Sequence, residues 1–162
     1  MQVGEVAQTF AATDHRGEPF DTAAFRDKRP VVIFFFPKAF TTGCTRQACA
    51  FRDSAAAFQA LDAEVIGVSA DPPEVLRDFA AKYNLPYRLV SDADGSLRKK
   101  FQVPRSMMGL LAGRVTYIIG RSGRLLDTYN SQLSWTQHVT VARAALEAES
   151  KAPAGAQATT SA

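Results

Sequence analysis

Short apolar runs and amphipathic segments follow one another along this chain and predict strands and helices in turn. Residues 31–36 read VVIFFF, an apolar run rich in β-branched and aromatic side chains, which is typical of a strand buried on both faces of a sheet. Pro37 ends this strand, because proline has no N–H to donate to a neighbouring strand. Four further short runs predict strands, at residues 64–69, 87–91, 115–119 and 124–129.

Apolar side chains at helical spacing fill the segments between these strands. A helix is predicted from Cys44 to about Ala60, with Phe51 and Phe58 on its buried face. Three more helices are predicted: one near Pro73 capped by Ser69 or Asp71, one at residues 96–101, and a last amphipathic one capped by Ser134. Strands that alternate with helices predict an α/β fold, a three-layer sandwich with a central mixed β-sheet flanked by helices.

The N-terminal part is predicted to form a hairpin. Residues 10–13 are expected to pair with residues 19–21 across a turn that leaves His15 in solvent. Thr22 is then expected to cap a short helix that ends at Phe25.

Composition and charge narrow the class of protein. The chain has 162 residues, 46% hydrophobic and 22% charged, which suits one globular domain over residues 1–150 and a disordered polar tail at 151–162. The net charge of +3 comes without a dense basic run, so we expect no nucleic-acid partner. No apolar stretch approaches the roughly 20 residues that span a bilayer, and residues 1–10 lack a signal-peptide pattern, so we expect a cytoplasmic protein without a membrane partner. Two cysteines and two histidines predict neither a disulfide framework nor a zinc site.

Cys44 stands where the buried strand gives way to a helix. The unpaired N–H groups and the dipole of a helix N-terminus favour an anion, and a thiolate is such an anion. Otherwise a free cysteine is most often a small buried hydrophobe, and position alone favours that interpretation for Cys49. Cys44 is therefore the candidate nucleophile.

The spacing of the two cysteines bears on whether they can pair. Five residues (49 − 44) along a helix correspond to a rise of roughly 7.5 Å and a turn of about 140° away. A disulfide needs Cα atoms within about 7 Å and converging Cβ directions, so the pair cannot bond while the helix is intact. The spacing argues against a structural disulfide and favours a transient one, formed after the first helical turns unwind.

Several segments resemble one enzyme family. The loop PKAFTTGC at residues 37–44 resembles the Pro-x-x-x-Thr-x-x-Cys loop of peroxiredoxins, and CTRQACAFRD at 44–53 resembles their Q-type branch, also called bacterioferritin comigratory protein. GRVTY at 113–117 is similar to the segment that carries the family's active-site arginine, and YNSQ at 129–132 to a tract of plant and cyanobacterial members. The resemblance runs from about residue 3 to 146 and implies a thioredoxin-like fold. Ala39, Phe40, Thr42 and Gln47 depart from the commonest bacterial pattern, which affects only the expected specificity.

Peroxide cleavage by a thiolate needs donors aimed at both peroxide oxygens. The backbone N–H groups of Gly43 and Cys44 are available at the helix start, Thr41 can add its hydroxyl, and Pro37 can shield the thiolate from water. The resemblance assigns the remaining guanidinium to Arg114, which by itself would be read as a surface arginine.

Two other arginines are alternatives to Arg114, and apolar side chains are expected beside the site. Arg46, on an early helical turn, and Arg121, in a hairpin loop, are the rivals of Arg114. An apolar approach suited to organic hydroperoxides is expected from five side chains, Phe40, Met107, Met108, Leu110 and Leu111.

The expected cycle oxidises Cys44 to a sulfenic acid, which condenses with Cys49 to an intramolecular disulfide. The resemblance implies peroxide substrates, recycling by thioredoxin or a similar dithiol, no cofactor and no metal, and we expect a monomer. Three alternatives stay open: a one-cysteine peroxidase that uses an external thiol, a thioredoxin-like redox-sensing or binding module, and a thiol-disulfide oxidoreductase. The absence of a Cys-x-x-Cys pair argues against the last.

Overall fold

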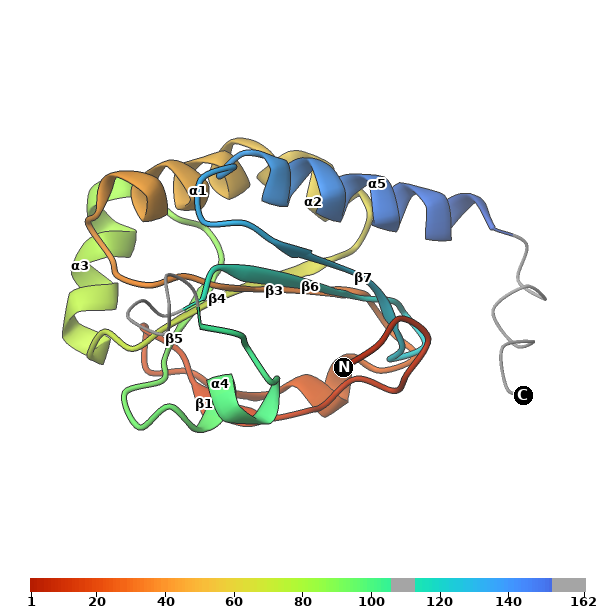
Figure 1. Cartoon of the computed structure of the whole chain (residues 1–162), viewed down its shortest axis with the longest axis horizontal. Coiled ribbons are helices and arrows are strands. Elements are labelled where there is room, and N and C mark those ends of the chain that lie inside the picture. Colours follow the sequence, from red (N-terminus) through yellow and green to blue (C-terminus); the bar gives the residue numbers. More distant parts are fainter. Residues whose placement is uncertain (106–112, 153–162) are drawn as a thin grey trace.

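A computed structural model describes residues 1–105 and 113–152 of the chain. Figure 1 shows a central sheet with a layer of helices on one face and the N-terminal segment with a short helix on the other. The strands are β1 (Ala11–Thr13), β2 (Pro19–Asp21), β3 (Val31–Phe35), β4 (Glu64–Ser69), β5 (Arg88–Ser91), β6 (Val115–Ile119) and β7 (Leu125–Asn130). The helices are the 3₁₀ turn η1 (Thr22–Phe25), α1 (Thr42–Asp53), α2 (Ala55–Ala60), α3 (Pro73–Tyr83), α4 (Ser96–Lys100) and α5 (Gln137–Lys151).

The apolar run that ends at Phe36 forms the middle strand of the sheet. The strand order is β5-β4-β3-β6-β7, in which β4 pairs with β3 in parallel and β6 pairs with β3 in antiparallel fashion. All five residues of β3 are buried, as expected for a strand covered on both faces. The predicted three-layer α/β sandwich with a mixed sheet is therefore confirmed.

Alternate residues of β3 and the adjoining Phe36 enter two separate cores. Phe34 and Phe36 pack with Phe51 and Phe58 beneath α1, α2 and α5, and the rings of Phe34 and Phe51 stack with centroids 4.4 Å apart. Ile33 and Phe35 instead enter the core on the opposite face of the sheet, below which α4 and the β1–β2 hairpin lie (Figure 1). Burying large aromatic side chains on both faces fixes the register of β3, because a shift by one residue would exchange the two sets.

The long helix predicted after Cys44 is interrupted. α1 ends at Asp53, and Ser54 lies between it and α2 with φ −98° and ψ 8°, outside helical geometry. The N–H of Ser54 donates to Ala50 and Phe51 carbonyls, which closes α1 with a tightened last turn. The interruption divides the predicted helix into a 12-residue α1, which carries both cysteines, and a six-residue α2.

Three predicted helix caps are wrong, and in two of them the side chain has another partner. Asp21, not Thr22, caps η1, since the buried Thr22 hydroxyl bonds both backbone groups of Phe10. Pro72 precedes α3, whereas Asp71 accepts the Ala39 N–H at 2.7 Å. Thr136 rather than Ser134 stands at the start of α5, and no side chain caps it.

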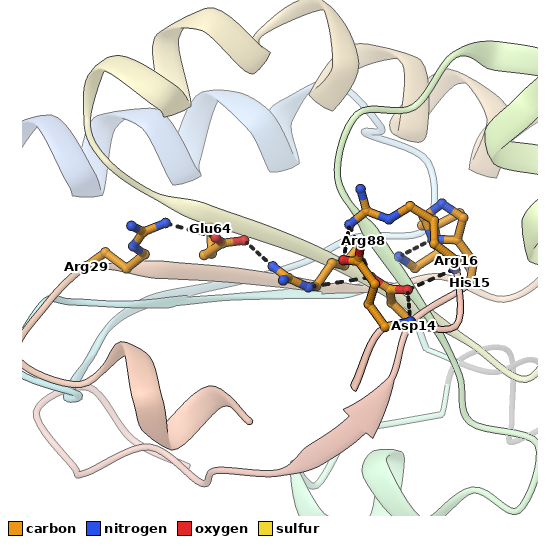
Figure 2. Close-up of polar contacts among 8 residues, drawn as sticks. Asp14, His15, Arg16, Arg29, Glu64 and Arg88 are labelled. Carbon is orange, nitrogen blue, oxygen red and sulfur yellow. Dashed lines mark hydrogen bonds and ion pairs between the residues drawn. The ribbon is translucent and has the colours of Figure 1, made fainter. Parts of the chain in front are cut away.

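A row of opposite charges ties the β1–β2 hairpin to the sheet. Figure 2 shows four charged side chains side by side, in the spatial order Arg29, Glu64, Arg88 and Asp14. Glu64 accepts a 3.0 Å bond from each of its two arginine neighbours. Arg88 Nε lies 3.6 Å from the fully buried Asp14 carboxylate. The network joins the hairpin to β4 and β5, and so closes the lower face of the sheet.

His15 is buried, which contradicts the expected solvent-exposed turn position. Its exposed fraction is 6%, and its Nδ1 accepts the Leu89 N–H at 3.1 Å while its backbone N–H donates to the Leu89 carbonyl (Figure 2 shows its place beside Asp14). Composition alone suggests a solvated turn, but β5 is an edge strand of the sheet, and its outer edge supplies unpaired backbone groups that an imidazole can satisfy.

The predicted tail and part of the predicted apolar approach fall outside the described residues. Residues 153–162 contain nearly all of the tail, and Lys151, its first predicted residue, ends α5. Residues 106–112 include the two methionines and two leucines expected near the site. Among residues 1–105 and 113–152, no helix combines the length and apolar character needed to cross a membrane.

Candidate active site

Cys44 lies at the start of α1, one loop beyond the end of β3. Thr41 is the N-cap residue of α1, and the first helical bond runs from the Thr45 N–H to the Thr41 carbonyl at 2.9 Å. The N–H groups of Gly43 and Cys44 precede that bond and point out of the helix end. The Cys44 side chain is 1% exposed. A sulfur at this place sits beside donors and the positive end of the helix dipole.

Arg114 reaches Cys44 because β6 runs antiparallel to β3. Val115 pairs with Phe35, so the residue before β6 lies beside the end of β3. The side chain of Arg114 is buried, and its Nη2 donates to Cys44 Sγ at 3.2 Å. Two residues 70 positions apart in sequence thus form one polar pair in an apolar surrounding, where such a pair interacts more strongly than in water.

Two further acceptors hold the guanidinium in place. Arg114 Nη1 donates to Gln47 Oε1 at 2.5 Å, and Arg114 Nε donates to the Gln132 carbonyl at 3.2 Å. Gln47 is fully buried, one turn after Cys44 on α1. The Gln47 Nε2 group has no hydrogen-bond partner within the described part of the chain. The side-chain amide therefore has an unused N–H donor next to Arg114. The fixed fork of Arg114 is therefore oriented by three separate acceptors.

Trp135 covers the first turn of α1. Its Nε1 donates to the same Gln132 carbonyl at 2.8 Å, and the Arg46 guanidinium lies 5.4 Å over its ring. A Cβ on Gly43 would approach Trp135 Nε1 to 2.5 Å and Arg114 Nη2 to 3.1 Å. Glycine at position 43 is thus required for the indole and the guanidinium to reach the helix start.

His138 braces the loop that supplies the Gln132 carbonyl. It is fully buried at the start of α5, with Nε2 2.9 Å from the Ser131 carbonyl and Nδ1 2.8 Å from the Thr116 hydroxyl. A carbonyl can only accept, so Nε2 carries the proton and the hydroxyl donates to Nδ1. Burial lowers the pKa of His138 to about 4, partly offset by the Ser131 carbonyl and reinforced by the charge of Arg114.

We expect His138 to make the protein less stable in acid. In the unfolded chain its pKa is the usual 6.5, and in the folded protein it is about 4, so below pH 6.5 only the unfolded chain takes up the proton. The free energy of unfolding should then fall as the pH drops from 6.5 to 4, by about 3 kcal/mol from this group. Urea unfolding at several pH values, on wild type and His138→Gln, measures it. The two pH profiles should converge towards pH 4, and parallel profiles would contradict the assignment.

Three other predicted site residues, Pro37, Phe40 and Thr41, lie in the loop between β3 and α1. The Thr41 hydroxyl donates to the Lys38 carbonyl at 2.7 Å, at the exposed mouth of the loop. Pro37 is half-buried directly after Phe36. Phe40 is 44% exposed, with a φ of 66°, and its ring packs edge-on against Phe79 with centroids 5.1 Å apart. A bulky residue in this left-handed region stores strain that the surrounding loop must hold.

The loop before Cys44 is held from both ends by charged side chains. Arg98 Nη2 donates to the Phe36 carbonyl at 3.0 Å, and Asp71 accepts the Ala39 N–H at 2.7 Å. Asp71 also accepts from Ser69 Oγ at 2.8 Å. These bonds fix the backbone on the N-terminal side of the strained Phe40.

The rival arginines have other partners in the structure. Arg46 is exposed and lies over Trp135, and Arg121 donates to the Lys28 carbonyl and pairs with Asp62 at 3.8 Å. Both cysteines are free thiols on α1, with Cys49 only partly buried. Within the described ranges no group of three or more His, Cys, Asp or Glu side chains could hold a metal ion.

Comparison with known proteins identifies the family. The chain matches the AhpC/TSA family over residues 3–127. It is 41% identical over 136 residues to the chloroplastic peroxiredoxin Q of Sedum lineare and to that of Arabidopsis thaliana, which covers 84% of this chain. The aligned part is 73% of the Sedum protein and 62% of the Arabidopsis protein.

Solved structures agree with the sequence relatives. Peroxidoxin BcpB from Mycobacterium tuberculosis superimposes with a TM-score of 0.82 at 36% identity, over 91% of this chain and 97% of that one. Peroxiredoxin Q from Xanthomonas campestris gives a TM-score of 0.78 at 26% identity, over 88% and 92% of the two chains.

The relatives also contradict the expected location of the protein and establish its family. The expected cytoplasmic location is wrong, since the plant relatives are named chloroplastic. The absence of a signal-peptide pattern bears only on secretion, so it does not indicate a cytoplasmic location. The family match across most of the sequence and the 41% identity to these peroxiredoxins show that the chain belongs to the AhpC/TSA family, as a thiol-dependent peroxidase of the peroxiredoxin Q type.

Proposed function

We propose that Cys44 is the peroxidatic residue and that it reduces hydrogen peroxide and organic hydroperoxides. The Cys44 thiolate attacks one peroxide oxygen, an S–O bond forms as the O–O bond breaks, and the other oxygen leaves as hydroxide or alkoxide and takes up a proton. The observation that carries this assignment is the 3.2 Å bond from Arg114 Nη2 to Cys44 Sγ. A cysteine attacks as the thiolate, and the buried Arg114 cation lies within hydrogen-bond distance of the sulfur that would carry this negative charge.

The same groups can stabilise the transition state, in which negative charge spreads from sulfur onto both oxygens. Arg114 donates to the sulfur in the structure, and the N–H groups of Gly43 and Cys44 at the helix start are further donors for this charge. We assign Thr41 a supporting role, in which its hydroxyl leaves the Lys38 carbonyl and turns to the peroxide. Pro37 shields the sulfur from water, as part of the same loop.

Phe40 supports the acceptance of organic hydroperoxides. Its 44% exposed ring stands at the mouth of the loop and offers apolar contact to an alkyl group. The bacterioferritin comigratory protein of Xanthomonas campestris, 26% identical to this chain, has alkyl peroxide reduction activity. Relative rates for hydrogen peroxide and cumene hydroperoxide, in wild type and Phe40→Ala, test this part.

We propose that Cys49 resolves the sulfenic acid. Cys49 attacks the Cys44 sulfur, an S–S bond forms, the S–O bond breaks, and water leaves with the proton of the Cys49 thiol. Both thiols belong to one helix of one chain, which supports an intramolecular disulfide within a monomeric unit. We propose that a dithiol such as thioredoxin reduces this disulfide. Mass measurement after one equivalent of peroxide, on wild type and Cys49→Ser, tests it, because only wild type should lose the mass of two hydrogens.

Oxidation is expected to melt the N-terminal part of α1. Five helical steps hold the two sulfurs apart, so the disulfide can form only if about residues 43–52 unwind. Hydrogen exchange on reduced and peroxide-treated protein should show sharply faster exchange for these amides after oxidation, with little change in β3, β4 or α5. An intact helix after oxidation, together with no intramolecular disulfide by mass, would favour a one-cysteine cycle with an external thiol.

A further inference from the structure

A buried tyrosine hydroxyl is bonded to the backbone of α1 between the two cysteines. Tyr87 lies just before β5, is 8% exposed, and donates from its hydroxyl to the Ala48 carbonyl at 2.6 Å. Ala48 is itself 1% exposed and is the residue directly before Cys49. Burial raises the pKa of Tyr87 well above its usual value, so the hydroxyl stays a donor at any working pH.

The bond joins α1 to a part of the fold outside the predicted unwinding segment. Tyr87 follows α3 and its ring packs edge-on against Phe34 of β3, with centroids 5.6 Å apart. A second tie runs from Arg52 Nη1 to the Tyr83 carbonyl at the end of α3, at 2.8 Å. α1 is thus bonded to the α3–β5 connection at two points, in addition to its own helical bonds.

We propose that Tyr87 is a positioning residue for the resolving step, a latch that holds α1 folded and so limits how often Cys49 can reach Cys44. The proposal rests on the two-cysteine cycle proposed above. Unwinding α1 displaces the Ala48 carbonyl, and the buried Tyr87 hydroxyl then loses its acceptor. A buried polar group without a partner is costly, so the bond shifts the equilibrium towards the folded helix.

The latch would determine how often each of two reactions consumes the sulfenic acid. In one, Cys49 condenses with it and releases water, as described above. In the other, a second peroxide transfers an oxygen to the sulfenate, which becomes a sulfinate while the peroxide leaves as water or alcohol. If α1 unwinds less often, Cys49 reaches the sulfenic acid more slowly, and a second peroxide reacts with it more often. Tyr87 should therefore raise the sensitivity of Cys44 to over-oxidation.

Tyr87→Phe removes the hydroxyl and keeps the ring, and the chain offers a matched control. Tyr117 is also buried, and its hydroxyl donates to a backbone carbonyl, that of Phe101, at 2.8 Å. Tyr117 lies in the core on the other face of the sheet, where its ring packs against Phe35. Tyr117→Phe therefore removes an equivalent bond without touching α1.

The first measurement is the rate of disulfide formation after rapid oxidation by one equivalent of peroxide, followed by acid quench and mass analysis. Removal of one neutral hydrogen bond should accelerate this step about two- to tenfold in Tyr87→Phe. The sulfinate formed per turnover at high peroxide should fall by a similar factor. The rate of the initial Cys44 oxidation should stay unchanged, and Tyr117→Phe should match wild type in all three.

The second measurement does not depend on a disulfide. In the fully reduced proteins, hydrogen exchange of the amides at residues 44–52 should be about two- to tenfold faster in Tyr87→Phe than in wild type or Tyr117→Phe. Equal exchange in the three proteins, or equal acceleration in both variants, would overturn the latch. If exchange responds as expected but wild type forms no Cys44–Cys49 disulfide, the latch on α1 stands, and its role in resolution fails together with the two-cysteine cycle.

Discussion

Replacement of Cys44 by serine is expected to abolish peroxide turnover. A serine hydroxyl is not ionised near neutral pH and is a far weaker nucleophile than a thiolate, so no sulfenic acid can form. Serine occupies nearly the same volume, and Arg114 Nη2 keeps an acceptor at this place, so the fold should persist. The measurement is peroxide consumption with thioredoxin as electron donor, alongside circular dichroism and the melting temperature.

Cys49→Ser is the matched control for this substitution. It removes the other thiol of α1 and should leave the first oxidation of Cys44 intact, so the variant should consume one equivalent of peroxide and then stop without an external thiol. Retained multiple turnover by Cys44→Ser with thioredoxin would contradict the assignment of Cys44.

Replacement of Arg114 by alanine is expected to slow Cys44 oxidation by roughly 10²–10³-fold, the range seen when one preorganised donor to a developing negative charge is lost. The guanidinium is the one side-chain group among the described residues that donates to Cys44 Sγ, the sulfur that we propose attacks the peroxide. Competition kinetics against a second peroxidase of known rate can measure the rate of this step directly.

Arg46→Ala and Arg121→Ala are the controls for Arg114. Arg46 lies over the ring of Trp135 and Arg121 binds the Lys28 carbonyl, so both variants should stay within about tenfold of wild type, below the range for a catalytic donor. Should Arg114→Ala slow oxidation less than about tenfold while either control slowed it more, another arginine would be the electrophilic group.

Local patterns in the sequence are sufficient to predict the scaffold of the site. The six apolar residues after Pro30 can only be buried as a two-sided strand, and the glycine and cysteine that follow them mark a helix start, so β3 and the start of α1 are predictable. Arg114 was identified through its resemblance to a family segment. Its contact with Cys44 depends on the antiparallel pairing of β6 with β3, which joins residues 70 positions apart.

The supports of the site could not be predicted, because each depends on a tertiary contact rather than on a local pattern. Gln47 looks like an ordinary helix-forming residue until α1 is placed against Arg114. Trp135 lies in a loop far along the chain, and only the packed fold places it near residue 43 and the Gln132 carbonyl. His138 lies at the start of α5, and only the packed fold places it against the Ser131 carbonyl, next to Gln132. The burial of His15 escapes prediction for the same reason, since its partner is the backbone of β5.

The contact between Trp135 and Gly43 gives the protein a built-in optical probe. Trp135 is the single tryptophan of the chain, and its indole touches the first turn of the helix that must unwind. It also lies under the charged side chain of Arg46, on the same helix, so unwinding changes both its solvent exposure and its electrostatic surroundings. Its fluorescence should therefore follow each oxidation and reduction of the cysteine pair in real time, without any label.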